Sequence, residues 1–245
     1  MVTSAACPRA VTLASPPRYD PTVRDRWLSR SVARRLPRLC FGLVVFGVGI
    51  ALMAQAGLGL GPWEVFHQGV SRQTGMQLGT VSILVGIPIL LLWWPLGERP
   101  GIGTVLNIVV IGVATNLTIP LLPVPVDVAP QLAMMAAGVV LIGLASGIYL
   151  SADLGAGPRD GLMTGVHHRF GWSISRARTA LELTVLLAGF LMGGAVGLGT
   201  IVFALGIGPI VQGALGIFDP SGTVARRRQA TLGPASSAIL EGPAE

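Results

Sequence analysis

The sequence predicts an all-α polytopic membrane protein with six transmembrane helices in two inverted three-helix repeats. Three observations support this prediction. The chain is 51% hydrophobic and only 11% charged, and its mean hydropathy is +0.70. Several uncharged runs exceed the about 20 apolar residues that a helix needs to cross a bilayer. A glycine- and proline-containing segment recurs 96 residues later, so the chain carries one module twice.

The uncharged runs define the predicted spans in chain order. Four runs suit one crossing each: residues 39–63, 73–97, 100–126 and 128–152. The fifth, 183–218, is too long for one crossing at about 1.5 Å per residue, and its glycines at 193, 194, 197 and 199 divide it into two helices. The predicted spans are 39–57, 79–96, 102–121, 131–151, 176–193 and 199–217. They group into membrane repeats at 39–121 and 131–217, between tails at 1–38 and 218–245 that are predicted to be disordered and cytoplasmic.

Arginine predicts the orientation of the spans. The first span is preceded by Arg24, Arg26, Arg30, Arg34, Arg35 and Arg38, and the last is followed by Arg226, Arg227 and Arg228. Because arginine-rich flanks stay in the cytoplasm, both termini are expected on the cytoplasmic side of a bacterial inner membrane. The net charge of +6 then matches attraction to anionic lipid headgroups and requires no nucleic-acid partner.

The number of spans in each copy determines how the copies are related. Each copy holds three spans, so the first begins inside and ends outside, and the second does the reverse. The copies are therefore expected to be related by a pseudo-two-fold axis in the membrane plane. Secondary transporters use this design and bind substrate between the repeats. The inference to transport is an analogy from architecture.

The doubled segment is the strongest local motif. Its helix-break backbone consists of Gly59, Gly61 and Pro62 in the first copy and of Gly155, Gly157 and Pro158 in the second. Glycine suits the position before a helix and proline the first position within it, while Glu64 and Asp160 fall in the first turn, where a carboxylate favours the positive helix end. The segment is either a well-formed helix start or a broken membrane helix that holds an anionic group. The helices that follow are too short to cross, so they either re-enter the bilayer or lie on its surface.

Arg178 and Glu182 form a second candidate site. They are four residues apart in the fifth span and therefore share one helical face. They are either an ion pair near the cytoplasmic end, with Arg178 reaching the headgroups, or part of a transport pathway. Glu182 is the best candidate for a proton- or substrate-linked carboxylate, and its counterpart in the first copy is Gly86.

These motifs resemble those of a known group. The doubled segment, the Gly-x-Gly-Thr turns at 101–104 and 197–200 and the Arg178/Glu182 pair are similar to those of the YczE/YyaS/YitT group of bacterial integral membrane proteins. The similarity covers about residues 38–218 and is most specific at 153–163. The resemblance implies a polytopic inner-membrane protein and supplies no substrate, cofactor or catalytic residue.

Signatures of enzymes and metal sites are absent from the sequence. The chain has no nucleophile elbow, phosphate-binding loop, zinc-protease motif or cysteine pair, so we expect no catalysis and no cofactor. His67, His167 and His168 fall in the two connector helices, where we expect them to be solvated rather than to bind metal.

The leading hypothesis is a small transporter or permease for an unidentified small molecule. Substrate binding or coupling is assigned to Glu64, Arg159, Asp160, Arg178 and Glu182. The alternative is a non-transporting accessory or scaffold protein for another membrane or secretion component. A third hypothesis is intramembrane catalysis on a lipid-like molecule. The expected partners are the lipid bilayer, a small-molecule substrate and either a second copy or another membrane protein.

Overall fold

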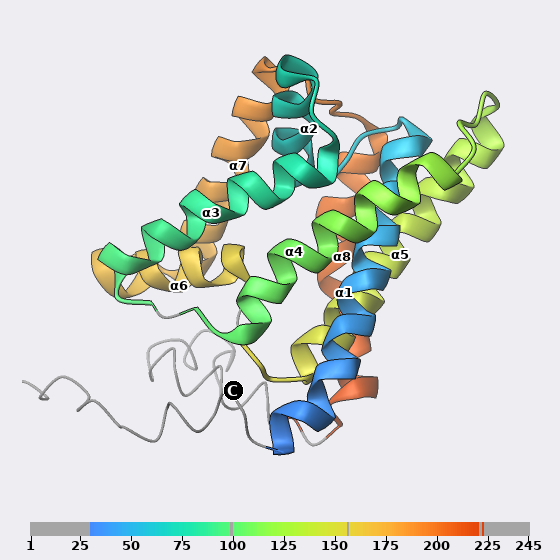
Figure 1. Ribbon diagram of the computed structural model, residues 1–245. Helices are drawn as coiled ribbons and strands as arrows, with labels where there is room; N and C mark the ends of the chain where they lie inside the picture. Colours follow the sequence, from blue (N-terminus) through green and yellow to red (C-terminus); the bar gives the residue numbers. More distant parts are fainter. Residues whose placement is uncertain (1–29, 99, 156, 221, 223–245) are drawn as a thin grey trace, which may run out of the picture.

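The computed structural model describes residues 30–98, 100–155, 157–220 and 222, and all regular structure among them is helical. Figure 1 shows the elements in chain order: α1 (Arg30–Ala56), α2 (Pro62–Thr74), α3 (Leu78–Leu96), α4 (Ile102–Thr118), the 3-10 turn η2 (Ile119–Leu121), α5 (Val128–Ser151), α6 (Pro158–Phe170), α7 (Ile174–Leu191) and α8 (Leu198–Phe218). Most of both predicted tails, including Arg24, Arg26 and residues 226–228, lies outside the described residues.

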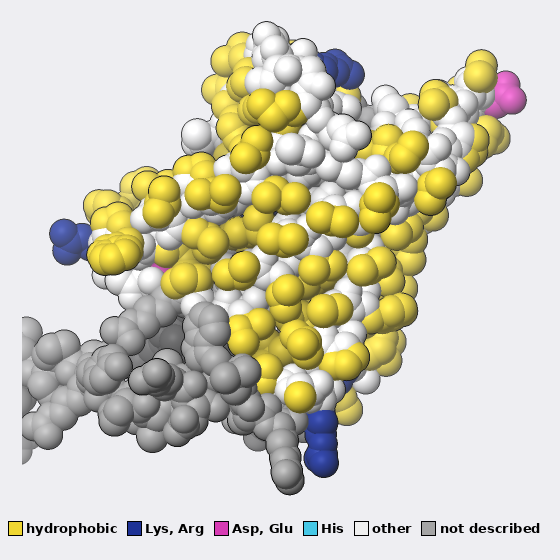
Figure 2. Space-filling view, viewed as in Figure 1, with side chains coloured by type: hydrophobic (Ala, Val, Ile, Leu, Met, Phe, Trp, Pro, Cys, Tyr) yellow, Lys and Arg dark blue, Asp and Glu magenta, His cyan; other side chains and the backbone are white. Residues whose placement is uncertain are grey.

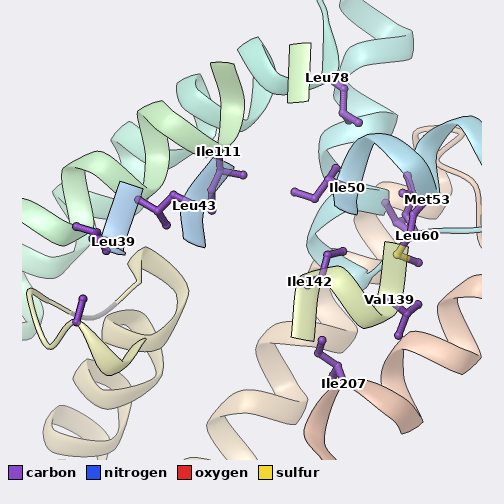
Figure 3. Packing of buried hydrophobic residues seen from close by; sticks show 12 residues of the cluster. Leu39, Leu43, Ile50, Met53, Leu60, Leu78, Ile111, Val139, Ile142 and Ile207 are labelled. Carbon is purple, nitrogen blue, oxygen red and sulfur yellow. The ribbon is translucent and has the colours of Figure 1, made fainter. Parts of the chain in front are cut away.

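The long helices α1, α4, α5 and α8 pack side by side and hold the main core. α1 lies between α5 and α4, and α5 also packs against α8 (Figure 1). Buried leucine, isoleucine, valine and methionine side chains fill the space between them (Figure 3). The other helices form a second group, in which α2 packs against α7, α3 against α6, and α3 against α4 of the first group. A smaller cluster of Trp63, Ile89, Trp93 and Leu162 lies within this second group.

The two copies pack against each other reciprocally. The N–H of Gly103 donates to the carbonyl oxygen of Leu154 at 3.0 Å. The equivalent residues, Gly199 and Leu58, make the same hydrogen bond, in which the N–H of Gly199 donates to the carbonyl oxygen of Leu58 at 2.7 Å. The Gly-x-Gly-Thr turn of each copy thus contacts the Gly-Pro segment of the other. A Cβ at Gly59, where φ is +108°, would lie 2.7 Å from the nitrogen of Gly197. Glycine is therefore required at this contact for both its conformation and its size.

Among the described residues, five helices are long and apolar enough to cross a membrane: Val32–Ala56, Leu78–Leu96, Ile102–Leu121, Val128–Ser151 and Leu198–Phe218. The region predicted as the fifth span does form a helix, α7, but Arg176, Arg178 and Glu182 make it less apolar than the others. The long run at 183–218 divides into two helices as predicted, with a turn at Gly193, where φ is +89°.

The boundary of the N-terminal tail was predicted too late in the chain. α1 already begins at Arg30, so residues 30–38 are helical rather than part of a disordered tail. The prediction followed hydropathy alone, whereas arginine, alanine and leucine all favour helix and extend α1 beyond the apolar run.

The outer surface is apolar over a broad area. Figure 2 shows hydrophobic side chains across the face formed by α3 and α4, with arginine side chains at its extremities. Large hydrophobic residues there are strongly exposed, including Leu91 at 66% and Leu117 at 65%. Water-soluble monomers rarely expose apolar patches of this extent. Together with the apolar helices, this surface identifies a multi-pass membrane protein.

Candidate functional site

α2 and α6 begin with the same local geometry. Their N-terminal caps, Gly61 and Gly157, have φ/ψ of −62°/158° and −60°/156°, and a proline occupies the first position of each helix. Both helices end at a glycine in the left-handed conformation, Gly75 at φ +73° and Gly171 at φ +69°. Neither N-cap is a residue whose side chain could cap the helix, because both are glycine.

Both short helices run from the interior of the protein to its surface. Pro62, Trp63, Glu64 and Val65 are buried at the start of α2, whereas residues 72–74 at its end are exposed. α6 likewise starts at the buried Pro158 and ends in three exposed residues, 168–170. Each short helix therefore begins among buried side chains and ends at the protein surface.

Glycines allow each short helix to pack closely against a long one. A Cβ at Gly161 of α6 would overlap the ring of Trp93 of α3, and the indole Nε1 of Trp93 donates to the carbonyl oxygen of Pro158 at 3.1 Å. The position equivalent to Trp93 in the second copy is Gly189 of α7, and a Cβ there would lie 2.5 Å from the backbone nitrogen of Phe66 on α2. A tryptophan ring thus packs on a glycine of α6 in one contact, and a glycine of α7 packs on the backbone of α2 in the other.

A cavity of about 340 Å³ opens where the starts of α2 and α6 converge, and each α-helix from α1 to α8 contributes to its walls. Many of its lining residues are paired positions 96 apart in the sequence. These pairs are Phe46 and Ile142, Pro62 and Pro158, Trp63 and Arg159, His67 and Met163, Ser82 and Arg178, Gly86 and Glu182, Asn107 and Phe203, and Ile111 and Ile207. The cavity therefore lies between the two copies.

An ion pair crosses between the copies beside this cavity. The guanidinium of Arg159 on α6 donates to the carboxylate of Glu64 on α2 and lies 5.1 Å from the centre of the Trp63 ring. Glu64 is only 3% exposed, whereas the side chain of Arg159 is 27% exposed and lines the cavity. Two buried side-chain atoms have no hydrogen-bond partner among the described residues: Nε1 of Trp63 and Oε2 of Glu64.

The second predicted pair reaches the same cavity from α7. Nε of Arg178 donates to Oε1 of Glu182 at 2.9 Å, and both side chains line the cavity together with Asp160. Four of the five predicted charged residues therefore share one cavity, and the fifth, Glu64, is bound to Arg159 beside it.

The six helix-break positions divide between two tasks. Pro62, Gly157 and Pro158 line the cavity. Gly61 caps α2 and packs against Phe203, while Gly59 and Gly155 have positive φ and receive the Gly-x-Gly-Thr turn of the other copy. No group of three His, Cys, Asp or Glu side chains suited to a metal ion occurs within the described part of the chain.

The structure also corrects the prediction for His67. It was expected to be solvated, but it is 4% exposed and lines the cavity, because α2 turns inward at its start. The prediction fits His168 better, since it is 3.4 Å from Glu98 at the surface. Trp63 and the apolar walls are not predicted from the sequence, because an aromatic or aliphatic residue gives no signal that distinguishes a cavity wall from a packed core.

Comparisons with known proteins agree with the membrane assignment. The model of a family of unknown function, DUF6198, matches residues 33–214. An uncharacterized protein of Haemophilus influenzae is 44% identical over 79% of this chain and 91% of its own length. The uncharacterized membrane protein YczE of Bacillus subtilis is 37% identical over 71% of this chain and 82% of its own length, and YyaS of the same organism is 24% identical over 66% and 82%. No solved structure matches the chain. The resemblance to YczE and YyaS is thus confirmed.

Proposed function

The chain belongs to the DUF6198 family, and we propose that it is a small transporter that moves a charged small molecule through the cavity between its two copies. The observation that carries this proposal is the cavity itself. Two ion pairs, Arg159 with Glu64 and Arg178 with Glu182, lie in or beside it, and two helices start at its wall. Ionisable groups are costly inside a membrane, and where they occur they usually line a substrate or ion pathway.

Reciprocal packing supports the inverted arrangement of the repeats. In a two-fold interface, if one residue contacts a second, then their equivalents also contact each other. The hydrogen bonds from Gly103 to Leu154 and from Gly199 to Leu58 follow this rule. Trp63 and Arg159 are equivalent positions that contact each other, as residues beside a two-fold axis do. With three crossings in each copy, this axis would lie in the membrane plane.

We propose α7 as the sixth crossing. It occupies the same place in the second copy as α3 does in the first, since Ile174 is 96 residues after Leu78. Its charged pair lines the cavity, whereas Leu187 and Phe190 on its outer side are 60% and 59% exposed, as residues facing lipid would be. An even number of crossings also agrees with the contact of Arg38, near the start of α1, with Phe218 at the end of α8.

The arginine distribution supports a cytoplasmic location for the end of the molecule that contains Arg34, Arg35 and Arg38. In a bacterial inner membrane, the cavity would then open alternately to the cytoplasm and to the outside as one repeat rocks against the other. Transport by this route requires no chemical conversion of the substrate, so we propose no catalytic residue and no cofactor.

Solute flux through purified protein tests the proposal. The full chain, inserted into liposomes loaded with a mixture of small bacterial metabolites, is expected to release at least one solute faster than protein-free liposomes do, as measured by mass spectrometry. Glu182→Gln should lower this flux at least tenfold, because Arg178 would lose its anionic partner. Glu98→Gln is the matched control, since Glu98 lies at the surface beside His168 and outside the cavity.

Two results would refute the proposal. One is the absence of solute release above that of protein-free liposomes. The other is equal flux for the unaltered chain and Glu182→Gln when both insert in equal amounts. Co-purification of a partner at fixed stoichiometry, combined with the absence of flux, would favour the accessory role instead.

A further inference from the structure

The start of α6 forms a polar niche in the cavity wall. A Cβ added at Gly157 would lie 3.6 Å from Oδ2 of Asp160 and 3.7 Å from the hydroxyl oxygen of Tyr149. It would lie 3.9 Å from Nδ2 of Asn107. All four residues line the cavity. Three polar side chains, from α4, α5 and α6, thus surround one small space beside Gly157, and we call this space the polar niche.

Asn107 brings a buried amide without a partner to the polar niche. It is 9% exposed and has no hydrogen-bond partner among the described residues. Its amide still reaches accessible space, because the unpartnered side-chain atoms that are fully enclosed in the described part of the chain belong to Trp63 and Glu64. Leaving a buried amide unpaired is costly, so each case calls for an explanation. A ligand bound in the cavity supplies one.

The equivalent place at the start of α2 is already filled. A Cβ added at Gly61 would lie 2.6 Å from Oε2 of Glu64 and 2.9 Å from the ring of Phe203. Phe203 is the counterpart of Asn107, since it lies 96 residues later. An aromatic ring therefore occupies the place that the amide has at the start of α6. A polar group of a ligand fits at the start of α6 rather than at the start of α2.

The charges around the cavity favour a ligand with one positive charge. Two guanidinium groups and three carboxylates lie in or beside it: Arg159, Arg178, Glu64, Asp160 and Glu182. Two positive and three negative formal charges sum to −1. His67 also lines the cavity but adds no charge, because burial disfavours the protonated imidazole. The positive end of α6 amounts to about half an elementary charge, so the carboxylate of Asp160 outweighs it.

An ammonium group matches the polar niche in its hydrogen bonds as well as in charge. It has three N–H donors and no acceptor. Asp160 and Tyr149 each offer an oxygen that accepts, and the amide of Asn107 can turn its carbonyl oxygen inward because no hydrogen bond to a described residue fixes it. Hydrogen bonds from a charged donor to such oxygens are stronger than those between neutral groups.

The wall beside the polar niche is apolar. Phe46 lines the cavity and packs edge-on against the Tyr149 ring, with 6.2 Å between the ring centres. Ile108 and Ile142 line it as well, and the volume of about 340 Å³ is at the small end of the range for ligand pockets. We therefore infer that the cavity binds a small organic amine with one positive charge, its ammonium group in the polar niche and its apolar body against these side chains. This inference rests on the proposed transport function and names its substrate class.

Calorimetric titration of the purified full chain in detergent tests the inference with four probes. Phenethylamine carries the ammonium group, whereas its trimethylated form keeps the positive charge but has no N–H donor. Phenethyl alcohol is neutral, and phenylacetate is an anion. Phenethylamine is expected to bind at least about tenfold more tightly than each of the other three, because it alone combines the positive charge with N–H donors.

Two variants test the polar niche itself. Asp160→Asn removes the negative charge and should weaken phenethylamine binding at least about tenfold, whereas Asp127→Asn at the exposed start of α5 should leave it unchanged. Asn107→Leu removes the amide and should weaken binding about fivefold. Because this amide has no partner among the described residues, the melting temperature of Asn107→Leu should stay the same or rise. A residue with only a structural role would show the opposite, a lower melting temperature with unchanged affinity.

Several results would overturn the inference. These are binding of the trimethylated cation, the alcohol or phenylacetate as tight as that of phenethylamine, no binding of any probe, or unchanged affinity in Asp160→Asn. If Asp160→Asn does not fold, Asn107→Leu and the comparison of the four probes on the unaltered chain decide. Flux assays separate this inference from the proposed function. Phenethylamine that binds without crossing the membrane refutes transport alone, whereas release of another solute without binding of phenethylamine refutes the amine site alone.

Discussion

Removal of Arg159 is the sharpest test of the ion pair between the copies. Arg159→Met keeps most of the side-chain stem but leaves the carboxylate of Glu64, 3% exposed, without its cationic partner. Breaking a buried pair by removing one partner costs about 3–5 kcal/mol. Because the side chain of Arg159 is 27% exposed to the cavity, we expect the lower end, about 3 kcal/mol. For a chain of this length, that corresponds to a melting temperature lower by about 6–12 °C.

Removing the charge of Glu64 instead should lower the free energy of unfolding by less. Glu64→Gln leaves the charge on Arg159, which is in contact with the cavity, so the loss should be about 1 kcal/mol. The double variant removes both charges and should be more stable than the sum of the two losses predicts, by about 1–2 kcal/mol. The stabilities of the unaltered chain, the two single variants and the double variant are compared by thermal unfolding in one detergent. Arg169→Met, at the exposed end of α6, is the matched control. Additive losses, within about 0.5 kcal/mol, would show that the pair is not coupled in the way the geometry requires.

Two further predictions concern packing and topology. Gly161→Ala should lower the free energy of unfolding by about 1–3 kcal/mol, because its Cβ would overlap the Trp93 ring, whereas Gly216→Ala, with no atom within 4 Å of its Cβ, should leave stability unchanged or slightly higher. Equal melting temperatures for these two variants would contradict the packing described for α6. In a chain without its two native cysteines, Ala33→Cys and Pro220→Cys should react with an impermeant maleimide from the same side of the membrane. Reaction from opposite sides would rule out six crossings.

The sequence was most informative where it repeats. The offset of 96 residues pairs α2 with α6 and α3 with α7, and the glycines of the Gly-Pro segments and Gly-x-Gly-Thr turns mark the contacts between copies. These features were predictable because glycine at a close backbone contact and proline at a helix start have a local physical cause. The sequence analysis also assigns Arg159, Asp160, Arg178 and Glu182 to one site beside the fifth predicted span, and these four residues line one cavity.

The remaining features depend on contacts distant in sequence. Nothing local to Glu64 or Arg159 indicates that they pair across the copies, because their separation of 95 residues gives no helical or strand period. The burial of His67 depends on α2 turning inward, and the polar residues around it resemble those of a surface helix. The start of α1 at Arg30 was missed because hydropathy reports membrane depth rather than helix length.

The two copies share a backbone arrangement, but most of the charged residues of the cavity belong to the second copy. The cavity walls pair positions 96 apart, yet Arg178 and Glu182 of the second copy correspond to the uncharged Ser82 and Gly86 of the first. Arg159 likewise corresponds to Trp63. If the two copies rock against each other, the shapes of the two end states should be similar because the backbones are related. In the proposed transport cycle, Arg159, Asp160, Arg178 and Glu182 would stay with the second copy in both states, while the first copy contributes Trp63 and the anionic partner of Arg159. The pairing of Arg159 with Glu64 would then be the charged contact that links the two copies beside the cavity. A change at Glu64 is therefore expected to alter the proposed flux as well as stability.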